Sequence, residues 1–161
     1  MLRKLKILLV LIVMLWGFVG ATHNVMDWEE TTGAVSAVTT MATFEGGAES
    51  RKATSNAIVI WAGALFITLS KLTAGFLSLL GALRMWQARD ADGRAFAAAK
   101  EYALAGAAVA VIMLFGGFIV IAESWFELWR SDVMRGPVLD SAFRYAGMLT
   151  LIALFVATPD E

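Results

Sequence analysis

The chain has 161 residues, of which 59% are hydrophobic and only 17% are charged. An average soluble domain is about 45–50% apolar and about a quarter charged, so lipid must solvate part of this apolar surface. The net charge of −1 offers no basic face for nucleic acid. Because the chain lacks cysteine and has one histidine, it cannot form disulfides, iron–sulfur clusters or a bis-histidine haem within a single chain. We expect a membrane protein without a cofactor or metal.

The first apolar run, Ile7 to Ala21, follows the basic residues Arg3, Lys4 and Lys6. A signal peptide also has a basic start, an apolar middle and small residues such as those at positions 19–21. We expect a retained transmembrane helix over about residues 4–22.

An outer loop, residues 23–56, follows this run and is too long to be a simple turn. Asp27 and Glu30 have the spacing of a capping box at a helix start. The apolar residues after them fall on one helical face: Trp28, Val35, Val38 and Ala42. The pattern predicts a short helix that lies on the outer membrane surface.

Three further apolar runs predict spans at about residues 57–86, 102–125 and 142–158. The first of these would reach about 44 Å at about 1.5 Å per residue, so it must tilt or project from a hydrocarbon core of about 30 Å. Pro159 cannot continue the last helix. The sequence therefore predicts an all-α membrane protein with four transmembrane helices in a single domain, residues 1–161.

Basic residues precede the first span and recur between the second and third spans, at Arg84, Arg89, Arg94 and Lys100. The positive-inside rule then places both termini in the cytoplasm. Tryptophans at both predicted interfaces agree with these depths, since they form the aromatic belt of a membrane protein: Trp61, Trp125 and Trp129 on one side and Trp86 on the other.

Lys71 lies near the middle of the second span, where a charge costs about 2.5–3.5 kcal/mol on insertion scales. Three interpretations stay open. The ammonium group snorkels to an interface, it pairs with a carboxylate such as Glu123, or it contacts a partner subunit, a lipid head group or a water-filled cavity. Small and weakly polar residues share its helix face: Ala64, Thr68, Ala74, Gly75, Ser78 and Ala82. We expect this face to pack against the third helix.

The third span ends in two glutamates, Glu123 and Glu127, which share one helix face. A solvated helix end with an aromatic anchor explains this segment. A protein contact through Trp125, Phe126 and Trp129 is a second explanation, because exposed Trp beside Arg is typical of binding hot spots. No histidine or third carboxylate at suitable spacing supports a metal site. Arg144 begins the fourth helix at the same interface, in a position to pair with either glutamate.

Several segments together resemble a family of bacterial predicted small integral membrane proteins, catalogued as a domain of unknown function. They are residues 6–10, 72–76, 81–89, 125–131, 142–145 and 159–161. The resemblance covers nearly the whole chain and implies a four-helix protein of the bacterial inner membrane without an assigned activity. The family pattern has glutamate at the positions of Lys71 and Ser124, and Glu123 stands one residue early.

We expect a non-catalytic accessory or scaffold subunit that packs against a larger membrane protein complex, because no catalytic constellation is visible. The expected partners are membrane lipids and integral membrane subunits, with an electron-transfer complex as one host. The alternative is a small oligomeric transporter or channel with a polar path at Lys71. The candidate interaction residues are Lys71, Thr68, Gly75, Ser78, Glu123, Trp125, Phe126, Trp129 and Arg144.

Overall fold

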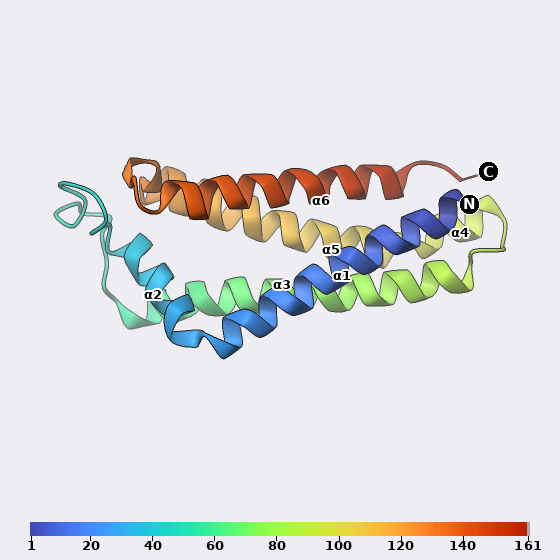
Figure 1. Ribbon diagram of the computed structural model, residues 1–161, viewed down its shortest axis with the longest axis horizontal. Helices are drawn as coiled ribbons and strands as arrows, with labels where there is room; N and C mark the ends of the chain where they lie inside the picture. Colours follow the sequence, from blue (N-terminus) through green and yellow to red (C-terminus); the bar gives the residue numbers. More distant parts are fainter. Residues whose placement is uncertain (161) are drawn as a thin grey trace.

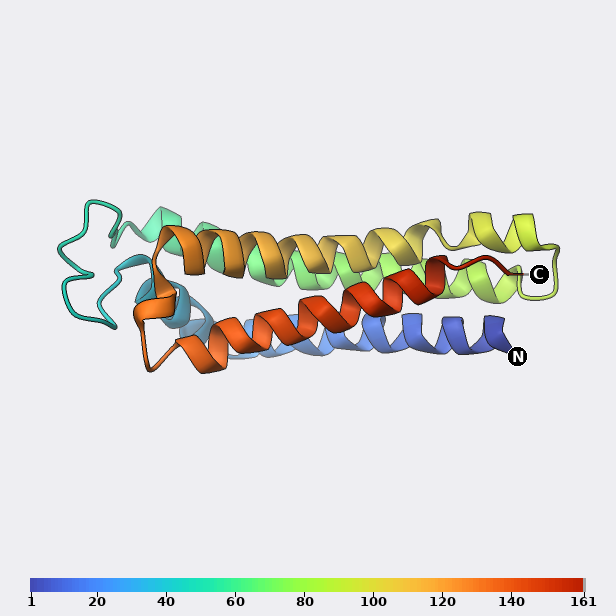
Figure 2. The same cartoon turned by 90° about the horizontal axis from the view of Figure 1, so that it is seen from above.

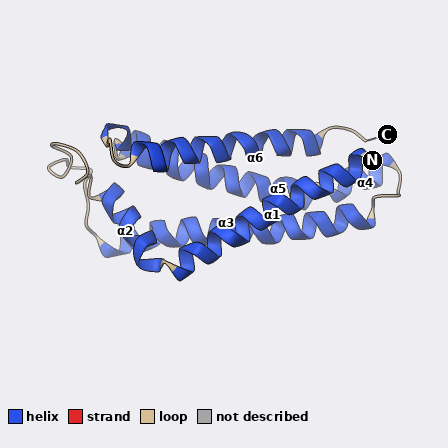
Figure 3. Cartoon of the chain, in the orientation of Figure 1, coloured by secondary structure: helices blue, strands red, loops and turns tan. Residues whose placement is uncertain are grey.

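A computed structural model describes residues 1–160 as an elongated bundle of helices (Figure 1). Helices joined by loops make up the whole described part of the chain, and the longest loop is at residues 40–56 (Figure 3). The elements in chain order are α1 (Leu2–Met26), α2 (Trp28–Thr39), α3 (Ala57–Gln87), α4 (Gly93–Ala99), α5 (Glu101–Val111), the π-helix η1 (Ile112–Trp125), the short η2 (Leu128–Arg130), η3 (Arg135–Asp140) and α6 (Ser141–Ala157).

Four helical segments are long and apolar enough to cross a membrane: Leu2–Met26, Ala57–Gln87, Gly93–Trp125 and Arg135–Ala157. We call them the first to fourth crossings. The all-α fold with four transmembrane helices is therefore confirmed. The third segment begins at Gly93 and not near residue 102, because Asp92 caps α4 by accepting a hydrogen bond of 2.8 Å from the backbone N–H of Ala95. That helix start lies among charged residues, where a search for apolar runs does not find it.

The helix predicted in the outer loop is present as α2, but its predicted capping box is wrong. The carboxylate of Asp27 bonds the ring of His23 at 2.8 Å and does not cap α2. Trp28 packs edge-on against Trp61 of α3, with ring centroids 5.3 Å apart. In Figure 1, α2 runs obliquely between the α1–α3 pair and the η1–α6 pair, whose left-hand ends diverge. Its position on a membrane surface stays a prediction.

Both ends of the described chain lie at the opposite end of the bundle, next to the α3–α4 turn (Figure 2). This end carries the basic residues that the positive-inside rule assigns to the cytoplasm. We call it the basic end, and the end with α2 and the long loop the outer end.

Helix α3 packs closely against two neighbours through small residues. A Cβ atom on Gly17 of α1 would lie 2.6 Å from the carbonyl oxygen of Lys71 and 2.7 Å from the backbone nitrogen of Gly75. A Cβ atom on Gly106 of α5 would lie 2.6 Å from Ser78 Oγ. The predicted packing of the second span against the third is thus confirmed, and an equally close contact with α1, which was not predicted, accompanies it.

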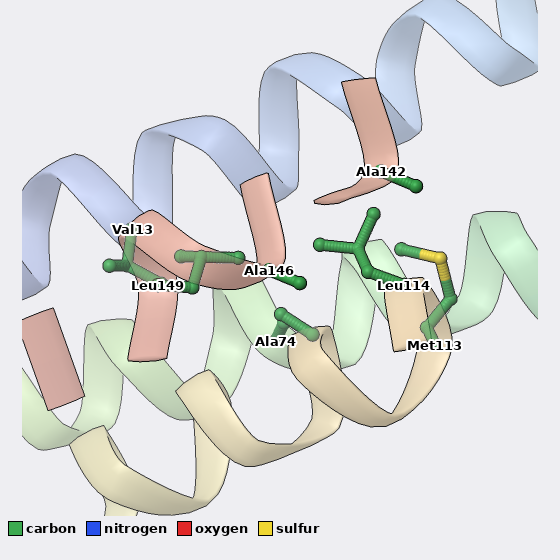
Figure 4. Packing of buried hydrophobic residues seen from close by; sticks show 8 residues of the cluster. Val13, Ala74, Met113, Leu114, Ala142, Ala146 and Leu149 are labelled. Atoms are coloured by element: carbon green, nitrogen blue, oxygen red, sulfur yellow. The ribbon is translucent and has the colours of Figure 1, made fainter. Parts of the chain in front are cut away.

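The centre of the bundle is filled by apolar side chains from all four crossings (Figure 4). The labelled residues are Val13, Ala74, Met113, Leu114, Ala142, Ala146 and Leu149. Large apolar residues on the outside of α3, such as Leu69, Phe76 and Leu83, are exposed, as side chains that face lipid must be.

Candidate functional site

A polar network joins the middle of α3 to the outer end of α1. Lys71 Nζ donates a hydrogen bond of 3.1 Å to Asn24 Oδ1. Asn24 Nδ2 donates in turn to Thr68 Oγ1 at 3.3 Å, and the Thr68 hydroxyl donates to the carbonyl oxygen of Ala64 at 2.9 Å. Asn24 and Thr68 are buried and Lys71 is half-buried. We call Lys71, Asn24 and Thr68 the polar network.

Gly20 makes room for the lysine side chain. A Cβ atom on Gly20 would lie 3.1 Å from Lys71 Cδ and 3.5 Å from its Nζ, so the aliphatic stem lies directly against the α1 backbone. Asn24 follows Gly20 by four residues and therefore stands on the same helix face one turn further on. The stem of Lys71 thus runs along α1 to an amide oxygen near the helix end.

Of the three interpretations of Lys71, the pairing with Glu123 is wrong, because the lysine bonds Asn24 and forms no ion pair with a carboxylate of residues 1–160. Asn24 lies outside the predicted first span, about residues 4–22, whereas α1 continues to Met26. The spacing of Gly20 and Asn24 at the end of an apolar helix is the signal that could have found this partner.

A cavity of about 550 Å³ lies beside the polar network, between α1, α2, α3 and η1. We call it the outer cavity. Lys71 and Asn24 contribute to its wall together with His23, Asp27, Glu30 and Thr31 at the α1–α2 joint. The rest of the wall is largely apolar, including Val35, Val38, Phe66, Ile67, Phe118 and Ile121.

The third crossing changes from α-helix to π-helix where it borders the outer cavity. Gly117, Phe118, Ile121 and Ala122 of η1 all line the cavity. A Cβ atom on Gly117 would lie 3.1 Å from the ring of Phe66, so the missing side chain admits that ring from α3. π-helical segments are rare and are frequently found at functional sites. This change of helix type was not predicted.

Glu127 organises a second polar cluster at the outer end. Its carboxylate accepts hydrogen bonds from Lys52 Nζ at 2.7 Å and from Arg130 Nη1 at 3.0 Å. These two hydrogen bonds, the one from Lys52 first, hold the pKa of Glu127 below its ordinary value. Arg130 also donates to the carbonyl oxygen of Glu45 at 3.1 Å, so the long loop is fastened to the end of the third crossing.

The remaining predicted residues at the outer end are dispersed. Trp125 and Trp129 are 55% and 54% exposed, whereas Phe126 is buried. The predicted pairing of Arg144 with Glu123 or Glu127 is wrong. Arg144 donates within its own helix turn, to the carbonyl oxygen of Asp140 and to Ser141 Oγ, and Glu127 pairs instead with Lys52 and Arg130. Glu123 is half-buried and forms no ion pair within residues 1–160.

Gly75 and Ser78 serve the packing of α3. Gly75 lies against the ring of Phe18, since a Cβ atom there would be 3.1 Å from that ring. Ser78 is fully buried beneath Gly106, and its hydroxyl has no hydrogen-bond partner in the described part of the chain.

A third cluster, at the basic end, was not predicted. Lys6 Nζ lies 2.9 Å from Asp160 Oδ2, Lys100 forms an ion pair with the same oxygen, and both lysines donate to the carbonyl oxygen of Thr158 at 2.7 Å. All three charged side chains are at most 3% exposed. Burial raises the pKa of Asp160, but the hydrogen bonds from Lys100 and Lys6 outweigh it and leave this pKa below its ordinary value. We call these residues the Asp160 cluster.

Four apolar crossings around small-residue contacts and an internal polar network define a small multi-pass membrane protein. The chain belongs to the family described as "predicted small integral membrane protein (DUF2165)", which matches residues 2–159. Nothing matches among curated proteins or among solved structures. Within residues 1–160, no group of three His, Asp or Glu side chains is placed to hold a metal ion.

We expect Asn24→Leu to destabilise the protein more than Lys71→Met does. Lys71→Met removes one hydrogen bond, which in membrane proteins is worth about 0.6 kcal/mol on average. Asn24→Leu costs about 1–3 kcal/mol, because it leaves the ammonium group without an acceptor. Unfolding in mixed detergent micelles measures both changes and the double variant. Equal losses from the two single variants would contradict the role assigned to Asn24.

Proposed function

We propose that the protein is a non-catalytic accessory or scaffold subunit that binds a larger membrane protein through its outer end. The supporting observation is a set of aromatic side chains there, Phe44, Trp125 and Trp129, two of which contact cations: Trp125 contacts Lys52 and Phe44 contacts Arg130. We call these five residues the outer aromatic patch. Its two tryptophans are more than half exposed.

Charged contacts hold two aromatic rings of the outer aromatic patch, those of Trp125 and Phe44. The Lys52 ammonium lies 5.6 Å from the ring centroid of Trp125, and the Arg130 guanidinium lies 4.7 Å from that of Phe44. Glu127 bonds both cations. Tryptophan and arginine dominate binding hot spots, and side chains that are already ordered lose less entropy on binding. These features support a protein contact beyond simple anchoring in the membrane interface.

The buried charges support a structural role for the rest of the molecule. Lys71 is engaged by an amide from α1, and Asp160 bridges lysines from α1 and the third crossing. Each arrangement joins helices and brings together no nucleophile and base. We place the protein in a bacterial inner membrane with both termini in the cytoplasm, which puts the outer aromatic patch on the opposite side. Integral membrane subunits, those of an electron-transfer complex among them, are the proposed partners.

A small oligomeric transporter is the second candidate, because the outer cavity reaches Lys71 at mid-helix. Further passage towards the basic end would run past Ser78, which is sealed by the α3–α5 contact at Gly106. A transporter therefore has to separate these helices. A cysteine placed at Ser78 tests this, since it would react with a water-soluble thiol reagent only if the path opens.

The subunit proposal is tested by the variant Trp125→Ala/Trp129→Ala in native membranes. We expect the protein to co-purify with an integral membrane partner at fixed stoichiometry in mild detergent, and the double variant to lose that partner. Loss of two hot-spot tryptophans costs about 4 kcal/mol or more, which is about a thousandfold in affinity. Quantitative mass spectrometry of the purified material measures the ratio.

Trp86→Ala is the matched control, because Trp86 is similarly exposed, at 49%, but lies at the basic end of α3. It should leave the partner ratio unchanged. The proposal fails if no stoichiometric partner is found, or if the Trp86 variant loses the partner as readily as the double variant.

A further inference from the structure

We propose that the outer cavity binds one amphiphile, an acyl chain with a carboxylate or phosphate head group, and that Lys71 binds this head group. The proposal concerns a small-molecule site and is independent of the subunit role. It rests on three observations: the unneutralised charge of Lys71, the apolar walls of the cavity, and the polar rim where α1 meets α2.

The ammonium group of Lys71 has unused hydrogen-bonding capacity that faces the cavity. An ammonium carries three N–H donors, and Lys71 makes one hydrogen bond, to the uncharged amide of Asn24. No carboxylate within residues 1–160 forms an ion pair with it. Charges at membrane depth are normally paired, so an anionic ligand would supply the missing counter-charge. The Asn24 amide would hold the lysine in position for that ligand.

The walls of the cavity suit a hydrocarbon chain. They include the rings of Phe66 and Phe118 and the aliphatic side chains of Val35, Val38, Ile67 and Ile121. The volume of about 550 Å³ falls within the range of about 300–1,000 Å³ that is typical of sites for small organic ligands. A chain of methylene groups can enter this space from the bilayer without meeting water, since the walls are as apolar as lipid tails.

The rim of the cavity is polar and lies where a head group would be. His23, Asp27, Glu30 and Thr31 line it at the α1–α2 joint, next to the packed rings of Trp28 and Trp61. Tryptophan rings of this kind mark the membrane interface. The carboxylate of Asp27 lies 2.8 Å from the ring nitrogen Nδ1 of His23, whereas the negative carboxylate of Glu30 would repel an anion. An acyl chain in the cavity would keep the head group beside Lys71, whereas a soluble anion has no such anchor at this depth.

Photo-crosslinking tests the proposal on the full chain in phosphatidylcholine nanodiscs. The probe is palmitate that carries a photoactivatable diazirine in its chain. We expect cross-links to peptides from α2 and η1, which form the apolar walls. Oleate and oleoyl-lysophosphatidylglycerol should compete, whereas oleyl alcohol and inorganic phosphate should not. Competition by only one of the two anionic amphiphiles would support the site and identify its source as a free fatty acid or a lipid head group.

Two variants, each with a matched control, test separately the charge of Lys71 and the space inside the outer cavity. Lys71→Met should lower the cross-link yield about tenfold, as expected for the loss of one charge-assisted contact, whereas Lys4→Met at the other end of α1 should not. Ala34→Phe places a ring in the cavity and should abolish the cross-link. Gly33→Phe, whose side chain meets open space, should not.

Three results would overturn the proposal. They are cross-links that fall only on lipid-facing positions, equal competition by oleyl alcohol, and a full yield from the Ala34 variant. Because the assay uses purified protein without a partner, its failure leaves the subunit proposal untouched.

Discussion

Replacing Asp160 with asparagine is expected to destabilise the protein by about 3–5 kcal/mol, the cost of removing one partner from a buried ion pair. The asparagine would keep the size of the side chain but leave Lys6 and Lys100 buried without a counter-charge from residues 1–160, sharing the carbonyl oxygen of Thr158. Those lysines come from α1 and from the start of the third crossing, so the variant loosens the whole basic end. Reversible unfolding in mixed micelles measures the loss.

Asp90→Asn is the control, because Asp90 pairs with Arg89 at the same end of the bundle but its side chain is 80% exposed. Exposed ion pairs contribute little, so this variant should match the wild type. A similar loss of stability from both variants would show that the Asp160 cluster contributes no more to stability than an exposed ion pair.

The pH dependence follows from the lowered pKa of Asp160. A carboxyl whose pKa is lower in the folded state stabilises the fold above its unfolded pKa, ordinarily 3.8, and loses this contribution as the pH falls through the folded value. The difference between the wild type and Asp160→Asn should therefore be full near neutral pH and shrink below pH 3.8. A difference that stays constant at acidic pH would contradict the ionised state assigned to Asp160.

The four crossings could be predicted from the sequence because each is a long apolar run, and such runs are a direct physical requirement of the bilayer. The stripe of small residues on α3 could also be predicted, because Thr68, Gly75 and Ser78 stand at the spacing of one helix face. The sequence assigned one partner of this stripe, the third span, but not the other, α1. Gly17 of α1 meets α3 at Lys71 and Gly75, and nothing in the sequence around Gly17 indicates this contact.

The polar contacts were the least predictable part. Lys6 and Lys100 read as loop charges that set orientation, and only the folded chain brings both against Asp160. Asn24 stands with Thr22 and His23 at the end of an apolar run, a polar sequence that also fits the start of a loop. The π-helix η1 was not predicted from the sequence, so neither was the outer cavity that it borders.

The contact between α1 and α3 leads to the second large effect, which we expect for Gly17→Leu. The new Cβ atom would lie 2.6–2.9 Å from backbone atoms of Lys71 and Gly75, and backbone cannot yield as a flexible side chain does. The helices must separate, at a cost of about 3 kcal/mol or more for overpacking. Because Lys71 itself is pushed away from α1, its hydrogen bond to Asn24 should break as well.

Gly147→Leu is the matched control for this overpacking. A Cβ atom at Gly147 of α6 meets nothing within 4 Å, and leucine favours a helix over glycine by about 1 kcal/mol. Unfolding of the two variants in the same micelles should therefore give changes of opposite sign. If Gly17→Leu were tolerated as well as Gly147→Leu, α1 would not lie directly against α3. In that case the position of Lys71 beside Asn24, on which the polar network and the outer cavity depend, would be lost with it.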